Sequence, residues 1–95
     1  MRKLTVNRPQ RIKIPFMKGR ILLNGNECAT VKAGKNVTID IPDGNHSVQV
    51  TFPAIPPVES DILYITASDG NITCDINIKV PISNNDLTTA SLTKI

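Results

Sequence analysis

The chain of 95 residues has very few aromatic side chains: two phenylalanines, one tyrosine and no tryptophan. Sites for single-stranded nucleic acid and for sugars usually use aromatic platforms, so this scarcity argues against both kinds of binding. It also predicts that the core is built from aliphatic side chains. No run of about 18 apolar residues occurs, so the sequence predicts no membrane-spanning helix.

Targeting and metal-binding signals are also missing. The basic start of the chain is not followed by an apolar stretch, so no signal peptide is predicted. This favours a cytoplasmic protein, or a fragment of a larger membrane-associated protein. The two cysteines and one histidine show no CxxC or HxxxH spacing, and the glycines do not form a phosphate-binding pattern. We therefore expect no metal site, no cofactor and no nucleotide.

The two cysteines are interpreted as free thiols. Cys74 alternates with Ile72, Ile76 and Ile78, which predicts a small buried side chain on the inner face of a strand. A Cys28–Cys74 disulfide is the alternative, and the lack of a secretory signal disfavours it.

Turn residues at regular intervals are the main positive feature. Between Ile21 and Phe52, the glycines of Asn24-Gly25, Ala33-Gly34 and Asp43-Gly44 separate stretches in which apolar and polar residues alternate. Asn-Gly and Asp-Gly suit tight hairpin turns because they tolerate positive φ. The pattern predicts a β-meander with strands at residues 19–24, 27–33, 37–41 and 46–52.

Further strands are predicted on both sides of this meander. A first strand covers residues 2–8, and prolines 9 and 15 bracket a short edge-like segment. Three prolines within residues 53–57 stop the meander and carry the chain to the other sheet or across an edge. A strand at 60–67, a hairpin turn at Asp69-Gly70 and a strand at 72–80 follow. No helical periodicity of useful length is present.

These elements predict an all-β fold, namely an antiparallel β-sandwich of the immunoglobulin-like or jelly-roll-like kind with about seven to eight short strands. A chain of this length supports one core, so we expect a single domain over residues 1–82. Residues 83–95 are rich in Ser, Thr and Asn. They are interpreted as a polar tail that is frayed or folds back as a loosely attached edge.

Charge divides the chain into two unequal parts. The first 20 residues carry seven basic and no acidic side chains, whereas the remainder carries four basic and eight acidic ones, so +7 and −4 give the net +3. One interpretation is an ordinary solvated strand face. The other is contact with an anionic surface, lipid headgroups or nucleic acid, through Arg11, Lys13, Lys18 and Arg20.

His46 is the only histidine and therefore the first candidate for acid–base chemistry. Its strand parity matches that of Val48 and Val50, at the end of the strand next to Asp43-Gly44. Ser47 points to the opposite face, so a nucleophile–base pair is not predicted. We expect a rim imidazole that hydrogen-bonds the turn backbone, and we predict no catalytic residue.

The order of segments 21–25, 31–35 and 39–50 is a strand, an Asx-Gly turn, a second strand, a glycine, and an apolar strand followed by Gly-x-His-x-Val-x-Val. This order resembles small bacterial β-sandwich modules of the PEGA-like type, and the resemblance covers roughly residues 18–80. The chain lacks the Pro-Glu-Gly-Ala stretch, and His46 stands where a tyrosine is usual. The resemblance implies a mostly noncatalytic module, often tethered to membranes or larger proteins, without an assigned ligand.

The functional expectation is a noncatalytic module of a bacterial protein that serves protein–protein contact or scaffolding, with an unidentified protein partner and no enzymatic activity. Docking on an anionic surface through the basic N-terminal segment is the alternative. A homodimer is also compatible with the sequence, because the edge strands of a small sandwich can pair with each other.

Overall fold

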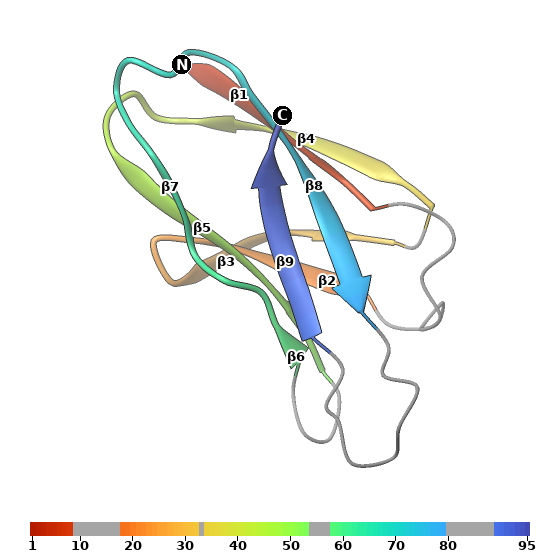
Figure 1. The fold of residues 1–95 in the computed structure, drawn as a ribbon. Helices are drawn as coiled ribbons and strands as arrows, with labels where there is room; N and C mark the ends of the chain where they lie inside the picture. Colours follow the sequence, from red (N-terminus) through yellow and green to blue (C-terminus); the bar gives the residue numbers. More distant parts are fainter. Residues whose placement is uncertain (9–17, 33, 54–57, 80–88) are drawn as a thin grey trace.

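The computed structural model describes residues 1–8, 18–32, 34–53, 58–79 and 89–95. These residues form two packed β-sheets and contain no helix (Figure 1), which confirms the all-β prediction. No helix suited to crossing a membrane occurs in the described ranges. The strands in these ranges are β1 (Arg2–Asn7), β2 (Gly19–Leu23), β3 (Asn26–Val31), β4 (Asn36–Ile41), β5 (His46–Phe52), β6 (Val58–Glu59), β7 (Leu63–Ile65), β8 (Ile72–Lys79) and β9 (Thr89–Lys94).

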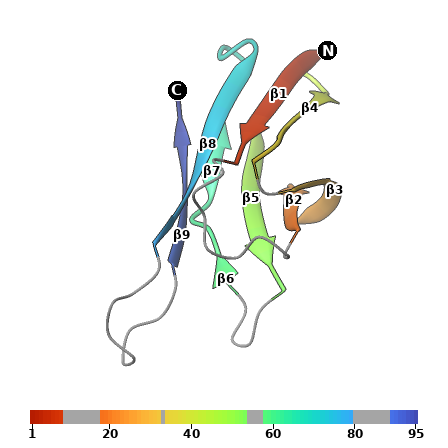
Figure 2. The ribbon, with the colours of Figure 1, turned by 90° about the vertical axis from the view of Figure 1, so that its right-hand side faces the viewer.

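The first sheet has the strand order β4-β1-β8-β9, and the second has the order β3-β2-β5-β6, with β7 also paired to β5. Figure 2 views the molecule from the side, with β8 and β9 of the first sheet to the left of β5 of the second. Most neighbouring strands are antiparallel, but β1 and β8 are parallel. The prediction of a purely antiparallel arrangement is therefore wrong at this pair.

The predicted meander forms only at its first hairpin. Asn24 and Gly25 both have positive φ, 54° and 84°, and join β2 to β3 as expected for an Asn-Gly turn. Beyond this hairpin the meander is wrong, because β4 pairs with β1 in the first sheet and β5 pairs with β2 in the second. Each strand has one apolar face, and crossing between the sheets lets the faces of β4 and β5 share one core. Gly34 and Gly44, also at positive φ, lie at the two crossings.

The predicted hairpin at Asp69-Gly70 is a further crossing between the sheets. Strand β7 pairs with β5, whereas β8 pairs with β1 and β9, so the strands on either side of this turn are not partners. The predicted strand 60–67 is also interrupted. Ser60 accepts a hydrogen bond from the Val50 amide through Oγ and donates its own amide to the Val50 carbonyl, so it lies between β6 and β7.

The chain segments around the three prolines return to the same sheet. Strands β5 and β6 pair antiparallel, with Phe52 opposite Val58. Passage to the other sheet, one of the two interpretations of this segment, is therefore wrong. Residues 54–57 and the edge-like segment between prolines 9 and 15 lie outside the described residues.

The last part of the chain forms the outer strand of the first sheet. Strand β9 pairs with β8 at six successive positions, and Leu92 is only 5 % exposed. Of the two interpretations of residues 83–95, folding back as an edge fits this pairing, although residues 83–88 lie outside the described residues.

The core between the sheets is aliphatic, as predicted, and among the described residues Phe52 is its only buried aromatic side chain. Gly19 lies close to this core, because an added Cβ would be 3.1 Å from the side chains of Phe52, Val31 and Val50, which would have to shift to accommodate it. Cys74 is fully buried, as the alternation predicted. Both cysteines are free, so the disulfide alternative is not realised.

Candidate functional site

Three connections meet at one end of the molecule and surround an open hollow of about 420 Å³. They are the β2–β3 turn, the β4–β5 turn and the segment after β7. The lining exposes more apolar than polar surface, and its polar groups are amides, hydroxyls and one imidazole. The lining residues are Asn24, Asn45, His46, Ser47, Tyr64, Ile65 and Thr66.

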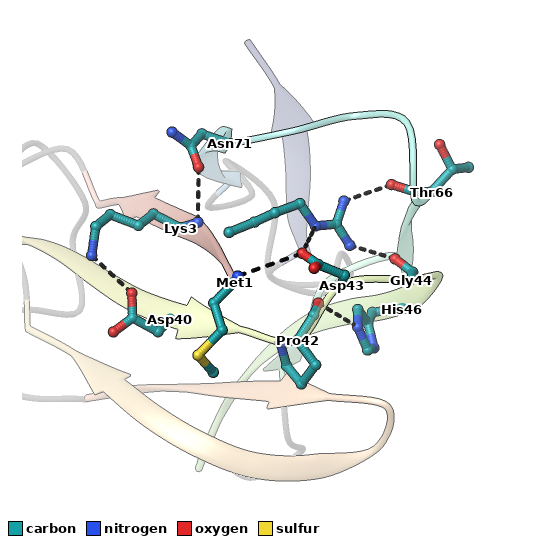
Figure 3. Close-up of polar contacts among 10 residues, drawn as sticks. Met1, Lys3, Asp40, Pro42, Asp43, Gly44, His46, Thr66 and Asn71 are labelled. Carbon is teal, nitrogen blue, oxygen red and sulfur yellow. Dashed lines mark hydrogen bonds and ion pairs between the residues drawn. The ribbon is translucent and has the colours of Figure 1, made fainter.

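His46 lies at this rim and bonds the turn backbone, as the sequence predicted. Its Nε2 is 2.9 Å from the Pro42 carbonyl oxygen (Figure 3), and its Nδ1 is 2.9 Å from the Asn24 side-chain nitrogen. The Asn24 amide orientation follows from its other contact, because Asn24 Oδ1 accepts the Ser47 backbone N–H. Asn24 therefore donates to Nδ1, and His46 carries its proton on Nε2 and donates it to Pro42.

This arrangement leaves neither imidazole nitrogen of His46 available to a reacting group. General base catalysis needs a ring nitrogen that can reach the proton it removes. Ser47, the neighbouring hydroxyl, follows the opposite parity on β5, and its backbone N–H and C=O both bond Asn24. The geometry fits a structural bridge between two turns.

Tyr64 gives the site its exposed apolar surface. The side chain is 71 % exposed, and that of Ile62, two residues earlier, is 46 % exposed. Tyr64 pairs with Ser47 across the β5–β7 ladder, so its ring lies on the outer face of the second sheet. Sequence reasoning did not single out Tyr64, although the alternation Leu63-Tyr64-Ile65 indicated that it would point away from the core.

Arg2 hydrogen-bonds two of the connections around the hollow, the β4–β5 turn and the segment after β7. Its guanidinium donates to the Thr66 carbonyl at 2.6 Å and to the Gly44 carbonyl. The side chain is almost completely buried. Its Nε also lies 4.0 Å from the Asp43 carboxylate. One side chain from β1 thereby joins the β4–β5 turn to the end of β7.

The segment after β7 has its own polar support. The Thr66 N–H donates to Asp69 at 2.7 Å, Lys94 pairs with the same carboxylate at 3.3 Å, and the Ala67 N–H donates to Asn45. The Thr66 backbone donor and then Lys94 lower the pKa of Asp69. The rim of the hollow is therefore held by bonds between neighbouring turns.

Of the four basic residues predicted to contact an anionic surface, the structure describes two, Lys18 and Arg20. Arg11 and Lys13 lie outside the described residues. Lys18 is exposed, and Arg20 lies 3.5 Å from Glu27 on the neighbouring strand.

The other basic residues of the first segment have partners within the protein. Lys3 pairs with Asp40 at 2.8 Å. Arg8 is 1 % exposed, donates to the Val31 carbonyl, and lies 4.9 Å from the centre of the Phe52 ring. Its burial lowers the pKa of the guanidinium. The interpretation of this segment as an ordinary solvated face is wrong for Arg2 and Arg8, because both side chains are buried. Alternation along a strand does not indicate which cationic side chains hydrogen-bond carbonyl groups inside the protein.

Metal and thiol chemistry find little support at this site. Within the described part of the chain, no three residues of the types His, Cys, Asp and Glu are grouped to hold a metal ion. Burial raises the pKa of Cys74 to about 11, and partial burial raises that of Cys28. Both shifts disfavour the thiolate, which is the reactive form of cysteine.

Comparison with known proteins gives no relative for this chain: no protein-family model, no curated protein and no solved structure matches it.

Proposed function

We propose that the protein is a noncatalytic binding module of the β-sandwich kind, with an immunoglobulin-like or jelly-roll-like arrangement, that contacts another protein. The resemblance to bacterial PEGA-like modules supports the same proposal and, with it, a bacterial origin. The contact surface is the hollow beside Tyr64, which we call the Tyr64 surface and define by the residues that line the hollow together with Ile62.

The observation that carries this proposal is the exposure of Tyr64 above a rim of fixed polar groups. Tyrosine is enriched in protein interfaces because it combines a large apolar ring with a hydroxyl and loses little side-chain entropy. The Asn24, Asn45 and Ser47 side chains lie around it. A partner segment could place an apolar side chain against Tyr64 and Ile62 and hydrogen-bond the surrounding amides.

A noncatalytic role is supported by the state of His46. Its two ring nitrogens serve the Asn24 and Pro42 contacts, and no activated thiol lies among the described residues. The polar groups of the rim therefore support the shape of the surface.

Selection of binders from a random-peptide phage library tests the proposal. We expect wild-type protein to enrich peptides whose binding falls at least tenfold in Tyr64→Ala and persists in Thr30→Ala. Thr30 is a suitable control because it is exposed on β3, away from the lining of the hollow. Failure to enrich any peptide, or binding that is equal in both variants, would contradict the proposal.

The second candidate function is docking on an anionic surface through Arg11, Lys13, Lys18 and Arg20. The net charge of the basic segment favours it, whereas the internal partners of Lys3, Arg8 and Arg20 reduce the charge available for an external contact. Binding to vesicles rich in phosphatidylserine, or to duplex DNA, should weaken steeply with salt if this function is correct. If the protein binds neither the vesicles nor the DNA at low salt, this second candidate function is wrong.

A further inference from the structure

Strand β4 is an outer strand of the first sheet, and its backbone groups divide into two sets. The Arg8 N–H donates to the Lys35 carbonyl just beyond the β1–β4 ladder. In an antiparallel ladder every second residue bonds the neighbouring strand, so residues 35, 37, 39 and 41 bond β1. The N–H and C=O groups of Asn36, Thr38 and Asp40 consequently point away from the sheet.

The opposite side of β1 supports this assignment. Lys3 lies opposite Asp40 in the register, and its N–H donates to the Asn71 side chain, which precedes β8. The backbone groups of Lys3 therefore face β8, as required if its partner Asp40 faces outward. No described residue hydrogen-bonds the outward backbone groups of Asn36, Thr38 or Asp40.

Among the described residues, the neighbouring outer strand β3 has edge protections that β4 lacks. The β2–β3 ladder contains a register shift between Ile21 and Leu22, and the Val31 carbonyl at the end of β3 accepts Arg8. Bulges and covered ends are known protections of sheet edges against pairing. Strand β4 has six regular residues, without a bulge, a proline or a lysine.

The side chains of β4 also suit pairing with another strand. On the inner face, Val37 and Ile39 are only partly buried, although they pack against the core. On the outer face, Asn36, Thr38 and Asp40 are exposed and carry a single charge, which Lys3 already balances. A strand laid beside β4 would cover apolar surface without burying an unpaired charge.

We propose that β4 pairs antiparallel with β4 of a second copy of this chain, with Thr38 on the two-fold axis. Outward-facing residues must meet outward-facing residues, so the two positions of each pair must have an even sum. Only the register in which the two residue numbers of each pair add up to 76 pairs all three outward-facing residues. In that register, residue 36 lies opposite 40, residue 38 opposite 38, and residue 40 opposite 36. Each of the three pairs exchanges two hydrogen bonds. The two four-stranded sheets thus become one continuous sheet.

The charge of Asp40 favours the same register and a second copy of the chain as the partner. Each Asp40 faces the Asn36 amide of the other copy, which can donate to the carboxylate, and keeps its Lys3 partner. The two Thr38 hydroxyls meet at the axis, as the Thr38 and Thr5 hydroxyls already do at 2.9 Å within the chain. A register with the sum of 80 would instead place the two Asp40 carboxylates opposite each other.

The short interface makes this a weak, concentration-dependent dimer. Three residue pairs cover much less than the roughly 1,200–2,000 Å² of a standard interface. The two-fold arrangement closes on itself, so it gives a dimer and not a fibre. Strand β4 and strand β7, which carries Tyr64, lie at opposite lateral sides of the molecule (Figure 1), so self-pairing leaves the Tyr64 ring accessible.

Cross-linking at the axis tests the register. In a Cys28→Ser background, Thr38→Cys places two thiols on residues with Cα atoms about 5.5 Å apart, within the range that a disulfide spans. Thr5→Cys is the control, because residue 5 lies one strand further in and its copies are separated by three strand spacings, about 14 Å. In a glutathione redox buffer we expect at least tenfold more disulfide dimer from Thr38→Cys. Equal yields would overturn the proposal.

Thr38→Pro provides an independent test of the interface. It removes an outward N–H and the exposed bond between the Thr38 and Thr5 hydroxyls, but it leaves the backbone bonds between β1 and β4 intact, so the variant should fold. We expect sedimentation equilibrium to show a dimer of wild-type protein at millimolar concentration and a monomer of Thr38→Pro, with only a small difference in melting temperature at low concentration. A monomeric wild type, or a dimer that survives Thr38→Pro, would overturn the proposal.

Discussion

The two outer strands of the first sheet, β4 and β9, have the same length and opposite surroundings. In β9, the bond from the Ile95 N–H to Thr73 shows that the odd-numbered residues face β8, so Ala90, Leu92 and Lys94 face outward. The central outward N–H, that of Leu92, donates to Asp61 at 2.8 Å. In β4 the central outward N–H, that of Thr38, has no partner among the described residues.

The two outer strands of one sheet therefore differ in whether their outward backbone groups are hydrogen-bonded within the described part of the chain. The β9 edge is closed from within, because β6 and β7 of the second sheet contact it and the segment between them supplies the Asp61 carboxylate. At the β4 edge, the outward backbone groups of Asn36, Thr38 and Asp40 have no hydrogen-bond partner in the described part of the chain. We infer that the β9 edge is used for stability and the β4 edge for association.

The largest expected effect concerns Arg8, which holds the end of β3 beside β4. Arg8→Met removes a bond from a buried cation to the Val31 carbonyl and the contact with the Phe52 ring. We expect the free energy of unfolding to fall by about 2–3 kcal/mol. Urea denaturation measures it. The matched control is Arg20→Met, because the ion pair of Arg20 with Glu27 is exposed, and a comparable loss there would contradict this role of Arg8.

The next effect concerns the closed edge itself. Asp61→Ala leaves the Leu92 N–H without its acceptor at a nearly buried position. We expect a loss of about 1–2 kcal/mol in the free energy of unfolding, and faster exchange of the Leu92 amide hydrogen. Asp61→Asn retains an acceptor oxygen and should recover most of the loss. If Asn and Ala behave alike, the carboxylate does not close this edge.

A smaller effect is expected at the rim of the Tyr64 surface. His46→Ala removes the hydrogen bonds to Pro42 and Asn24 and should lower the free energy of unfolding by about 1 kcal/mol. Thermal melting measures the change, and an unchanged melting temperature would disprove the structural role of His46. Dimerisation through β4 should be unaffected, since His46 belongs to the second sheet.

The smallest effect is a pH dependence on the β9 side. Because the pKa of Asp69 is lowered in the folded protein, the ionised carboxylate stabilises the fold above its ordinary pKa of 3.8. This stabilisation is lost as the pH falls through the lowered value. We expect Asp69→Asn to melt below wild type at pH 7 and to approach it at acidic pH. A difference that stays constant with pH would show that Asp69 acts without its charge.

Local features of the fold were predictable from the sequence, and pairing between distant strands was not. The Asn24-Gly25 hairpin and the rim position of His46 depend on residues a few positions apart, where turn chemistry and alternation are decisive. The same alternation cannot specify whether β4 pairs with β5 or with β1, because both choices bury Val37 and Ile39. The meander prediction failed for this reason.

The candidate site was predictable only in part. The basic residues were counted as surface charge, since nothing in a strand pattern indicates that Arg2 reaches the Thr66 carbonyl 64 positions away. The exposure of Tyr64 follows from its parity in β7, but the hollow beside it depends on three connections that meet only in the folded chain. Likewise, the sequence could not identify β4 as an outer strand, because this depends on its pairing with β1.

The central claim is that β4 pairs with itself and that Asn36 faces Asp40 of the second copy. Sedimentation equilibrium of two charge variants tests it most directly, because Asn36 is exposed and both should fold. Asn36→Lys places an opposite charge across from Asp40 twice in each dimer, and Asn36→Asp places a like charge there. We expect the dimer Kd to fall by about fivefold in the first and rise by about fivefold in the second. Equal dissociation constants in the two variants would contradict the claim.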